Sequence, residues 1–402
     1  MNDFEKTFIL QHRGDHVTTL LLQSDRYPEV DVRKMAVQIS AWQTALHKLP
    51  LWAATDDILY PVHLSMEQCS SQATGHYKGT LVKQLLGGKE QPTIIDLTGG
   101  FGVDSTMIMR EVKHGHLIFV ERNEELCQLA QHNFPLLGVE NATIVHGLGE
   151  EQLAHYPQAD IVFLDPARRD SNGGKTVHIG DCTPNVSTLL TVFAQRGCTA
   201  VVKLSPMLSI SEAKMQLKTD NYGVSEVHIV STEGECKELL LVLSPQPSSK
   251  TVCINLTREG VQRFVFDEEE ERQAVCTYAE RPETYLYEPN ASLLKGGAYK
   301  VLAARLGLKK LHSNSHLYTS EEHCKDFPGR TFEIVDYASF NKKELKRLLA
   351  GIKKANLTVR NFPMSVAYLR KKLKISEGGN DYLFATTLAD DSHVLLRCKK
   401  PS

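Results

Sequence analysis

Between residues 93 and 204, short apolar runs alternate with segments of helical periodicity. The runs that predict strands are Thr93–Leu97, Leu117–Val120, Thr143–Val145, Ile161–Leu164 and Ala200–Leu204. Segments such as Glu124–Asn133 and Val186–Gln195 predict helices between these strands. Alternation of this kind is typical of a parallel sheet covered by helices. The sequence therefore predicts an α/β fold built on a doubly wound parallel sheet.

A glycine-rich turn follows the first predicted strand. It reads Asp96-Leu97-Thr98-Gly99-Gly100-Phe101-Gly102-Val103-Asp104. Glycines let a backbone approach a ligand closely, and an acid about 20 residues on can hold ribose hydroxyls. Glu121 follows the second strand at that spacing. Ser105 replaces the third glycine of an NAD-type loop, so S-adenosylmethionine (SAM) is favoured over NAD. A tight turn without a ligand is the alternative.

Polar residues also follow the fourth predicted strand. The chain continues Asp165-Pro166-Ala167-Arg168-Arg169-Asp170. Because the carboxyl ends of parallel strands border one ligand crevice, Asp165 should face the same crevice as Asp96 and Glu121. A carboxylate there can accept a proton from an attacking amine. Lys203, at the end of the fifth strand, is either a substrate contact or a partner of Asp165.

The C-terminal third is basic although the whole chain is almost neutral. Residues 291–402 hold 21 Lys and Arg against 10 Asp and Glu, whereas residues 1–290 carry a net charge of −13. Two predicted helices carry much of this charge: one with Leu345, Leu348, Leu349 and Ile352 on its apolar face, and one over Val366–Leu373. The predicted nucleic-acid contacts are Lys342, Lys343, Lys346, Arg347, Lys353, Lys354, Arg370, Lys371 and Lys372. Such density suits a phosphate backbone; a solvated charged face is the alternative.

Other segments give local predictions. Asp31 is the expected N-cap of a helix in which Val32, Met35, Ile39 and Leu46 recur at helical spacing. Ser65-Met66-Glu67-Gln68 fits a capping box. Glu226–Val230 and Glu238–Leu243 predict a β-hairpin that closes the sheet edge, and Asp267–Glu271 predicts an acidic turn. Strands are expected at Val252–Leu256, Arg263–Phe266, Leu357–Arg360, Tyr382–Leu388 and Val394–Lys399.

Several classes of protein are disfavoured by the sequence. Nine cysteines stand singly without a CxxC pair, so neither a zinc ribbon nor a disulfide framework is expected. His312, His316, His323 and Cys324 are close in sequence, but loop histidines of this kind are usually surface residues, and no metal site is predicted. No stretch approaches the roughly 20 apolar residues of a membrane span, and the N-terminus lacks a signal-peptide core. The expected location is the cytoplasm.

Together these motifs resemble those of class I SAM-dependent methyltransferases. The segment Asp96–Gly102 resembles their first motif, Glu121 the second, and Asp165-Pro166-Ala167-Arg168 the fourth, of Asp-Pro-Pro-Tyr type. With Leu64–Ser71 and the basic C-terminal region, residues 60–402 are similar to bacterial methyltransferases that carry a THUMP-like domain. The resemblance implies a Rossmann-like catalytic domain, a ferredoxin-like segment and RNA modification.

The implied division has four parts. These are residues 1–88 as an N-terminal helical region, 89–247 as the Rossmann-like methyltransferase domain, 248–332 as a ferredoxin-like α+β region and 333–402 as a basic THUMP-like RNA-binding module. The residues expected to bind SAM are Asp96, Thr98, Gly99, Gly100, Phe101, Gly102, Asp104, Glu121, Arg122, Gly147 and Asp165. The expected catalytic residues are Asp165, Pro166, Arg168 and Lys203. The expected reaction is in-line transfer of a methyl group to a nitrogen or oxygen of a tRNA or rRNA nucleotide.

Three departures from the family pattern keep alternatives open. Thr98 occupies the place of the usual first glycine, and the usual adenine-contact acid is absent from Val145–Gly149, where Glu150 or a backbone N–H could serve. The Asp-Pro motif lacks the second proline and the base-stacking aromatic; the guanidinium plane of Arg168 could stack instead. The alternatives are a small-molecule or protein methyltransferase, a non-catalytic RNA-binding protein on a SAM-binding scaffold and, more distantly, an NAD-dependent reductase.

Overall fold

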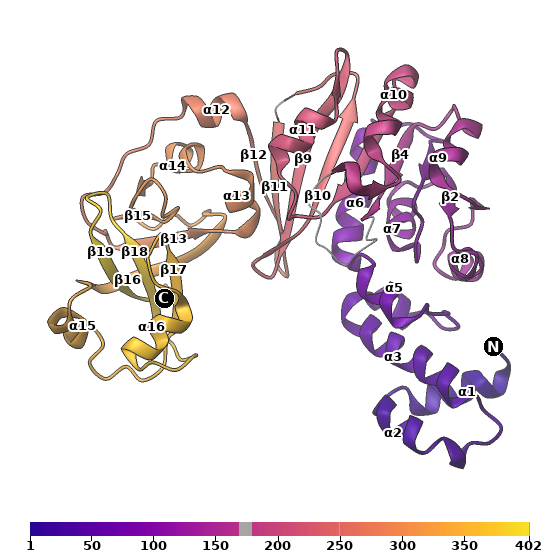
Figure 1. Ribbon diagram of the computed structural model, residues 1–402, viewed down its shortest axis with the longest axis horizontal. Coiled ribbons are helices and arrows are strands. Elements are labelled where there is room, and N and C mark those ends of the chain that lie inside the picture. Colours follow the sequence, from indigo (N-terminus) through magenta and orange to yellow (C-terminus); the bar gives the residue numbers. More distant parts are fainter. Residues whose placement is uncertain (169–178, 249, 402) are drawn as a thin grey trace. The chain divides into compact units, whose positions relative to one another are not determined.

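A computed structural model describes residues 1–168, 179–248 and 250–401 of the protein (Figure 1). For His63, Leu64, Arg168 and Asp181 it describes the backbone alone. The chain forms two compact units. The first comprises Met1–Ser225 and Leu239–Ser248, and the second comprises Glu226–Glu238 and Ser249–Ser402. The chain passes between the units three times: within β9 (Tyr222–Thr232), within β10 (Glu235–Ser244) and between Ser248 and Ser249.

The first unit is built on a Rossmann-like sheet. Its parallel strands are β1 (Thr93–Asp96), β2 (His116–Glu121), β3 (Ala142–His146), β4 (Ile161–Leu164) and β7 (Thr199–Leu204), in the order β3-β2-β1-β4-β7. The second half of β10 pairs antiparallel with β7. All five predicted strands are confirmed. The prediction succeeds because strands that are covered by helices on both faces are continuous apolar runs in the sequence. The order reverses beside β1, so the ligand crevice of such sheets is expected at the carboxyl ends of β1 and β4.

Helices connect the parallel strands. α7 (Val103–Glu111) follows β1, α8 (Glu124–Leu136) follows β2 and α10 (Val186–Arg196) precedes β7. The predicted helices over 124–133 and 186–195 are thereby confirmed. The smaller elements of this unit are α9 (Gly149–Gln152), η2 (Leu153–His155), β5 (Ala167–Arg168), η3 (Ile179–Asp181), β6 (Cys182–Thr183), α11 (Ile210–Gln216) and β8 (Lys218–Thr219).

Seven short or long helices precede the sheet. They are α1 (Asp3–His12), α2 (Val17–Leu22), η1 (Ser24–Arg26), α3 (Val32–Lys48), α4 (Pro50–Ala54), α5 (His63–Gln68) and α6 (Gln72–Leu85). Asp31 caps α3 as predicted, since its side chain accepts from the amides of Arg33 and Lys34. Of the apolar residues that indicated this helix, Val32, Met35 and Ile39 are buried, whereas Leu46 is 44% exposed.

The predicted capping box at Ser65 is wrong. Val62 is extended, so α5 begins at His63 and Ser65 lies inside the helix. Cys69 is extended too and ends α5. The cap that starts the long helix α6 is Ser71, whose hydroxyl accepts from the amide of Thr74.

The N-terminal helices and the sheet share one core. Trp52, Tyr60 and Met66 are buried in a cluster that also contains Phe101 and Met107 from the region around α7. The indole N–H of Trp42 donates to the carbonyl of Ala53, so this tryptophan is also part of the helical framework. The second half of the N-terminal region therefore packs against the sheet unit, with α6 directly on α7, whereas α1, α2 and the start of α3 share a separate core.

The second unit contains a seven-stranded sheet. Its order is β14 (Lys309–Lys310), β15 (Tyr318–Ser320), β13 (Tyr285–Pro289), β16 (Gly329–Ser339), β19 (His393–Lys399), β18 (Tyr382–Thr387) and β17 (Asn356–Arg360). Only β17 and β18 pair in parallel. The helices of this unit are α12 (Glu268–Gln273), α13 (Ala291–Gly296), α14 (Lys300–Leu306), α15 (Lys342–Leu348) and α16 (Val366–Leu373). The predicted final strands and the helix at 366–373 are confirmed.

Three predictions for this unit need correction. The expected hairpin of β9 and β10 forms, with Glu233 and Gly234 at positive φ in its turn. It does not close the sheet edge, because β11 (Lys250–Thr257) pairs with β9. The edge strand is β12 (Gly260–Asp267), which pairs with β11. The expected acidic turn is a helix, α12 (Glu268–Gln273), capped by Asp267. The helix expected to carry Leu345, Leu348, Leu349 and Ile352 is shorter than predicted, because α15 ends at Leu348. Leu349 and Ile352 follow the helix and still pack against the apolar cluster that contains Leu345 and Leu348.

Among the described residues, no helix is both long enough and apolar enough to cross a membrane.

Candidate functional site

The glycine turn connects β1 to α7 at the carboxyl edge of the parallel sheet. Gly100 and Gly102 have φ values of +57° and +80°, a region that glycine enters without steric cost. A Cβ on Gly99 would lie 2.3 Å from Cζ of Phe119, whereas a Cβ on Gly100 would meet only the carbonyl oxygen of Thr98, at 3.8 Å. Gly99 is therefore required by packing, and Gly100 borders open space that a ligand can approach.

Asp96 holds the glycine turn from beneath. Its carboxyl is buried and accepts hydrogen bonds from the Thr98 amide at 3.0 Å and from the Ser105 hydroxyl at 2.5 Å. Burial raises the pKa of Asp96 to about 7, although both hydrogen bonds act in the opposite direction. Both carboxyl oxygens are thus engaged by the turn itself. A direct contact between Asp96 and a cofactor stays a prediction.

Glu121 faces the turn from the end of β2. Its carboxylate accepts from the Gly100 amide at 2.7 Å and from the Asn123 amide at 2.8 Å. The amide of Gly147 donates to the Glu121 carbonyl at 3.0 Å, which brings the loop after β3 to the same edge. The neighbouring Arg122 is exposed. The structure thus brings together three of the predicted cofactor residues: Gly100, Glu121 and Gly147.

Phe101, another predicted cofactor residue, belongs to the N-terminal core. Its ring is buried and lies 6.4 Å from the ring of Trp52 and 6.2 Å from that of Tyr60, measured between centroids. It anchors the glycine turn to the helices, and its side chain is directed into that core.

Asp165 and Lys203 form a close ion pair at the ends of β4 and β7. The ammonium nitrogen of Lys203 lies 2.5 Å from a carboxylate oxygen of Asp165. The amide of Asp165 donates to the hydroxyl of Thr98 at 2.6 Å, so Thr98, the departure from the family glycine, ties the two loops together. Of the two roles open to Lys203, the structure supports that of a partner for Asp165.

The rest of the Asp-Pro motif is described only in part. Pro166 is buried, and the backbone of Ala167 and Arg168 forms the short strand β5, which pairs with β6. The side chain of Arg168 and the whole of Arg169 and Asp170 lie outside the described part of the chain. The predicted catalytic role of Arg168 therefore stays a prediction.

A buried lysine beside this pair was not identified from the sequence. Lys78 of α6 is fully buried, and its ammonium nitrogen lies 3.1 Å from Oδ1 of Asp104 in α7. Oδ2 of Asp104 accepts from the hydroxyl of Ser70 at 2.8 Å and lies 3.8 Å from the ammonium nitrogen of Lys203. Burial opposes ionisation of Asp104, but the ammonium groups of Lys78 and Lys203 hold the pKa of that carboxyl below its usual range.

The sequence does contain a signal for Lys78. It lies between Gly75 and Gly79 on one face of α6, and a Cβ on either glycine would come within 2.8 Å of an atom of Met107 in α7. Two glycines at that spacing indicate close contact with another helix. A lysine on such a face must be buried and paired.

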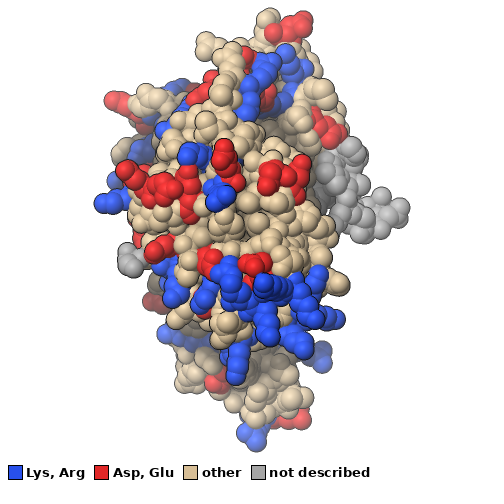
Figure 2. Space-filling model, turned by 90° about the vertical axis from the view of Figure 1, so that its left-hand side faces the viewer, with Lys and Arg blue, Asp and Glu red and all other residues tan. Residues whose placement is uncertain are grey.

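The predicted nucleic-acid contacts occupy the C-terminal module. Figure 2 shows Lys and Arg side chains gathered in a band on one face, at the level of α15 and α16 in Figure 1. Both helices pack on one apolar cluster that includes Leu345 and Leu369. Six of the lysines are exposed and form no ion pair within the described part of the chain. They are Lys342, Lys343, Lys346, Lys353, Lys354 and Lys371.

The other three predicted contacts are engaged inside the module. Arg347 pairs with Asp336 at 2.5 Å and with Glu344 at 3.3 Å. Arg370 lies 3.4 Å from Glu377 and also donates to the carbonyl of Ala355. The Lys372 ammonium lies 5.0 Å above the ring of Phe340. The structure therefore divides the nine residues into six free lysines and three internally bound cations.

The histidines near residue 316 are separated. His316 stacks on Tyr299 with 3.6 Å between centroids, His323 stacks on Tyr285, and His312 lies 3.2 Å from Asp391. Across the described ranges, no group of three or more His, Cys, Asp or Glu side chains is placed to hold a metal ion.

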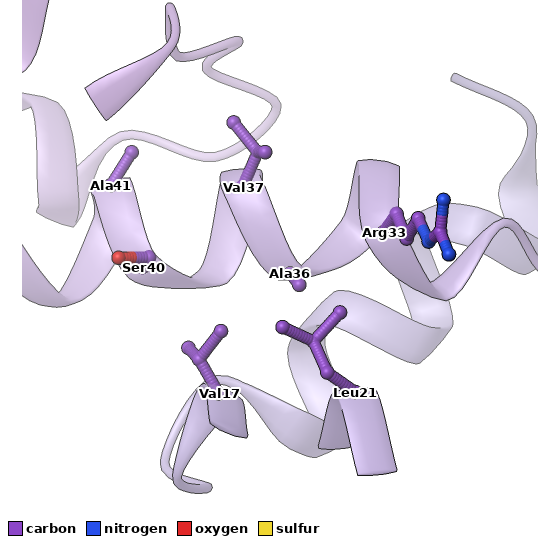
Figure 3. A pocket seen from close by; sticks show the side chains of 7 residues that line it. All are labelled: Val17, Leu21, Arg33, Ala36, Val37, Ser40 and Ala41. Atoms are coloured by element: carbon purple, nitrogen blue, oxygen red, sulfur yellow. The ribbon is translucent and has the colours of Figure 1, made fainter. Parts of the chain in front are cut away.

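A hollow of about 400 Å³ lies between α2 and α3, far in sequence from the glycine turn (Figure 3). It is lined by Val17, Leu21, Arg33, Ala36, Val37, Ser40 and Ala41. Arg33 is its one charged residue, and the lining contains no acid, base or nucleophile arranged for chemistry.

Comparison with known proteins supports the architecture. Residues 285–328 match the family model of a ferredoxin-like domain, and residues 329–400 match that of a THUMP domain-like family. The crystal structure of a candidate methyltransferase from Porphyromonas gingivalis W83 is 35% identical in sequence. It covers 99% of this chain and 98% of its own, with a TM-score of 0.86.

More distant structures share less. A candidate class I S-adenosylmethionine-dependent methyltransferase from Listeria monocytogenes is 13% identical and covers 63% of this chain and 93% of its own, with a TM-score of 0.41. An rRNA methylase from Streptococcus thermophilus is 12% identical and covers 41% of this chain and 93% of its own, with a TM-score of 0.30. No curated protein matches the sequence. The identity and coverage of the P. gingivalis protein show that the chain belongs to the bacterial class I SAM-dependent methyltransferases with a THUMP-like domain.

Proposed function

We propose that the protein methylates a nucleotide of tRNA or rRNA, with SAM as the methyl donor and the basic C-terminal module holding the RNA. The observation that carries this proposal is the Asp165 carboxylate, held by Lys203 at the sheet edge that also bears the glycine turn. Its side chain is 38% exposed, so a substrate can reach it. An RNA substrate would place the protein in the cytoplasm.

The residues at this edge fit SAM. The ligand is cationic at sulfur and nitrogen and carries two ribose hydroxyls, and the edge offers the carboxylates of Glu121 and Asp165. Glu121 would hold the ribose hydroxyls, and the open space at Gly100 would let the ligand lie against the turn. When bound, the cofactor supplies a methyl group already activated on a sulfonium.

In the proposed reaction, Asp165 orients the target group and accepts its proton. Its carboxylate accepts a hydrogen bond from the N–H or O–H of the target nucleotide, orients the lone pair and takes up the proton that this group loses. Lys203 keeps the carboxylate in place, and Thr98 fixes its backbone. Because the methyl group is already activated, positioning is the main contribution of these residues.

The six free lysines support RNA as the substrate. Exposed lysines without internal partners can neutralise phosphates and release the counterions bound there. The same contacts are independent of base identity. They support a nucleic acid without specifying the target nucleotide.

The test is nucleoside mass spectrometry on separately purified tRNA and rRNA from a host that lacks the gene. The host is complemented with the wild-type protein, with Asp165→Ala, or with Asp220→Ala, an exposed aspartate of the same unit, as control. We expect one methylated nucleoside to disappear without the gene, to return with wild type and Asp220→Ala, and to stay absent with Asp165→Ala. SAM affinity of Asp165→Ala, measured by calorimetry, should fall far less than turnover.

Other results would favour the alternatives. If no nucleoside changes, and RNA binds with an affinity that is flat between low and high salt, a small-molecule or protein substrate is favoured. If the wild-type protein does not bind SAM in the calorimeter, a non-catalytic RNA-binding role is favoured.

A further inference from the structure

We infer that Lys78 and Asp104 are positioning residues of the methyl-transfer site, which hold Lys203 so that it can orient the Asp165 carboxylate. This inference depends on the proposed role of Asp165. Neither residue faces the substrate; they act through Lys203. Sequence motifs assign Asp104 to the cofactor, whereas its contacts in the structure lead to the catalytic pair.

Lys203 lies between two carboxylates. Its ammonium nitrogen is 2.5 Å from Asp165 and 3.8 Å from Asp104. A lysine head group is a compact charge on a flexible four-carbon stem, so a single partner does not define its position. A second carboxylate on the inner side limits the positions that the ammonium can take, and with them the direction in which Asp165 is held.

Asp104 is itself fixed from the interior. Lys78 contacts one of its oxygens at 3.1 Å, and the Ser70 hydroxyl donates to the other at 2.8 Å. Lys78 also donates to Ser70 at 3.1 Å, which closes a small ring of contacts. The charges alternate along the row Lys78, Asp104, Lys203 and Asp165, and side-chain exposure rises along it from 0% to 12%, 13% and 38%. The row leads from the core to the crevice.

Holding α6 against α7 does not require this buried pair. Lys83 and Glu111 join the same two helices at the surface, 3.5 Å apart, and Gly75 and Gly79 let the helices approach closely. A buried ion pair is weak evidence for stability, because desolvation offsets most of the attraction. What sets the buried pair apart is that Asp104 also lies 3.8 Å from the ammonium nitrogen of Lys203.

The central test is the double variant Lys78→Met/Asp104→Asn. It removes both buried charges together, and the amide can still accept the hydrogen bond from Ser70. We expect a melting temperature close to that of wild type, unchanged SAM affinity by calorimetry, an unchanged KM for RNA from the gene-deleted host and a kcat reduced at least tenfold. The matched control Lys83→Met/Glu111→Gln should leave kcat as in wild type. A double variant with full kcat would overturn the inference.

A milder variant covers the case in which the double variant fails to fold. Ser70→Ala removes one hydrogen bond to Asp104 and leaves every charge in place. We expect kcat to fall about threefold to tenfold with KM unchanged; wild-type kcat would contradict the inference. Asp165→Ala in the same assay separates the two proposals. If Asp165→Ala keeps full turnover, the proposed function of Asp165 fails. If only the Lys78 and Ser70 variants keep it, the inference alone fails.

Discussion

The sheet edge that bears the glycine turn and the C-terminal module are both rich in charged side chains, but these charges are paired in one and unpaired in the other. At the edge, Asp104, Asp165 and Lys203 lie close to opposite charges, and Asp104 and Lys203 are only 12% and 13% exposed. In the module, six lysines are exposed and have no acidic partner within the described ranges. Paired charges fix a geometry, which chemistry needs. Unpaired charges are available to an external polyanion, and this difference separates positioning from binding.

The largest expected effect tests the paired charges. Lys78→Met leaves Asp104 with one ammonium fewer in a buried site, and breaking a buried pair on one side typically costs about 3–5 kcal/mol. Lys83→Met on the same helix breaks a surface pair with Glu111, for which about 0–1 kcal/mol is typical. Both tryptophans, Trp42 and Trp52, lie in the first unit, so denaturant unfolding followed by tryptophan fluorescence reports on it.

If the two variants lose equal stability, the comparison between buried and exposed pairs breaks down. If Lys83→Met is the more damaging of the two, the surface pair holds α6 and Lys78 does not.

A smaller effect is expected in how the free energy of unfolding depends on pH through Asp96. Burial raises its pKa to about 7 in the folded chain, against 3.8 without burial. Between about pH 4 and 7 the folded state thus retains a proton that the unfolded state has lost, so the free energy of unfolding falls as the pH rises through that window. Asp96→Asn does not titrate.

The free energy of unfolding of Asp96→Asn relative to wild type should therefore increase with pH from 4.5 to 7.5 and then level off. One pKa unit equals about 1.4 kcal/mol, so we expect at least a change of that size. Tryptophan fluorescence in denaturant at both pH values measures it. A relative stability that is flat across this range would show that burial does not raise the pKa of Asp96 in the folded chain.

The strands of the catalytic sheet could be predicted because their information is local. An apolar run such as Ile161–Leu164 suits a buried strand wherever its neighbours lie. The cap predicted at Ser65 shows the limit of such local cues, because Ser65 lies inside α5 and the serine that caps a helix is Ser71, at the start of α6. The acids at 267–271 were read as a turn, although Glu271 accepts from the amides of Lys300 and Val301 about 30 residues later.

The candidate site divides in the same way. Asp96, Gly100, Glu121 and Asp165 follow strands, so sheet topology alone brings them to one edge. Lys78 and Asp104 come from different helices and meet through the packing of α6 on α7, which no strand end indicates. Within the basic helices, sequence does not distinguish a free cation from an internally bound one. Lys346 and Arg347 are adjacent and differ only in whether an acid lies within reach.

That adjacent pair gives the smallest and sharpest test of the comparison. Lys346 has no ion pair in the described structure, whereas Arg347 is held by Asp336 and Glu344. If free charges alone meet phosphate, Lys346→Ala should lower the slope of log affinity for RNA against log salt by about 0.7–0.9, the value of one phosphate contact. Arg347→Ala should leave the slope nearly unchanged, because its charge is already neutralised within the module. Equal losses of slope would mean that Arg347 exchanges Asp336 for phosphate when RNA binds, and pairing within the free protein would then no longer separate binding residues from structural ones.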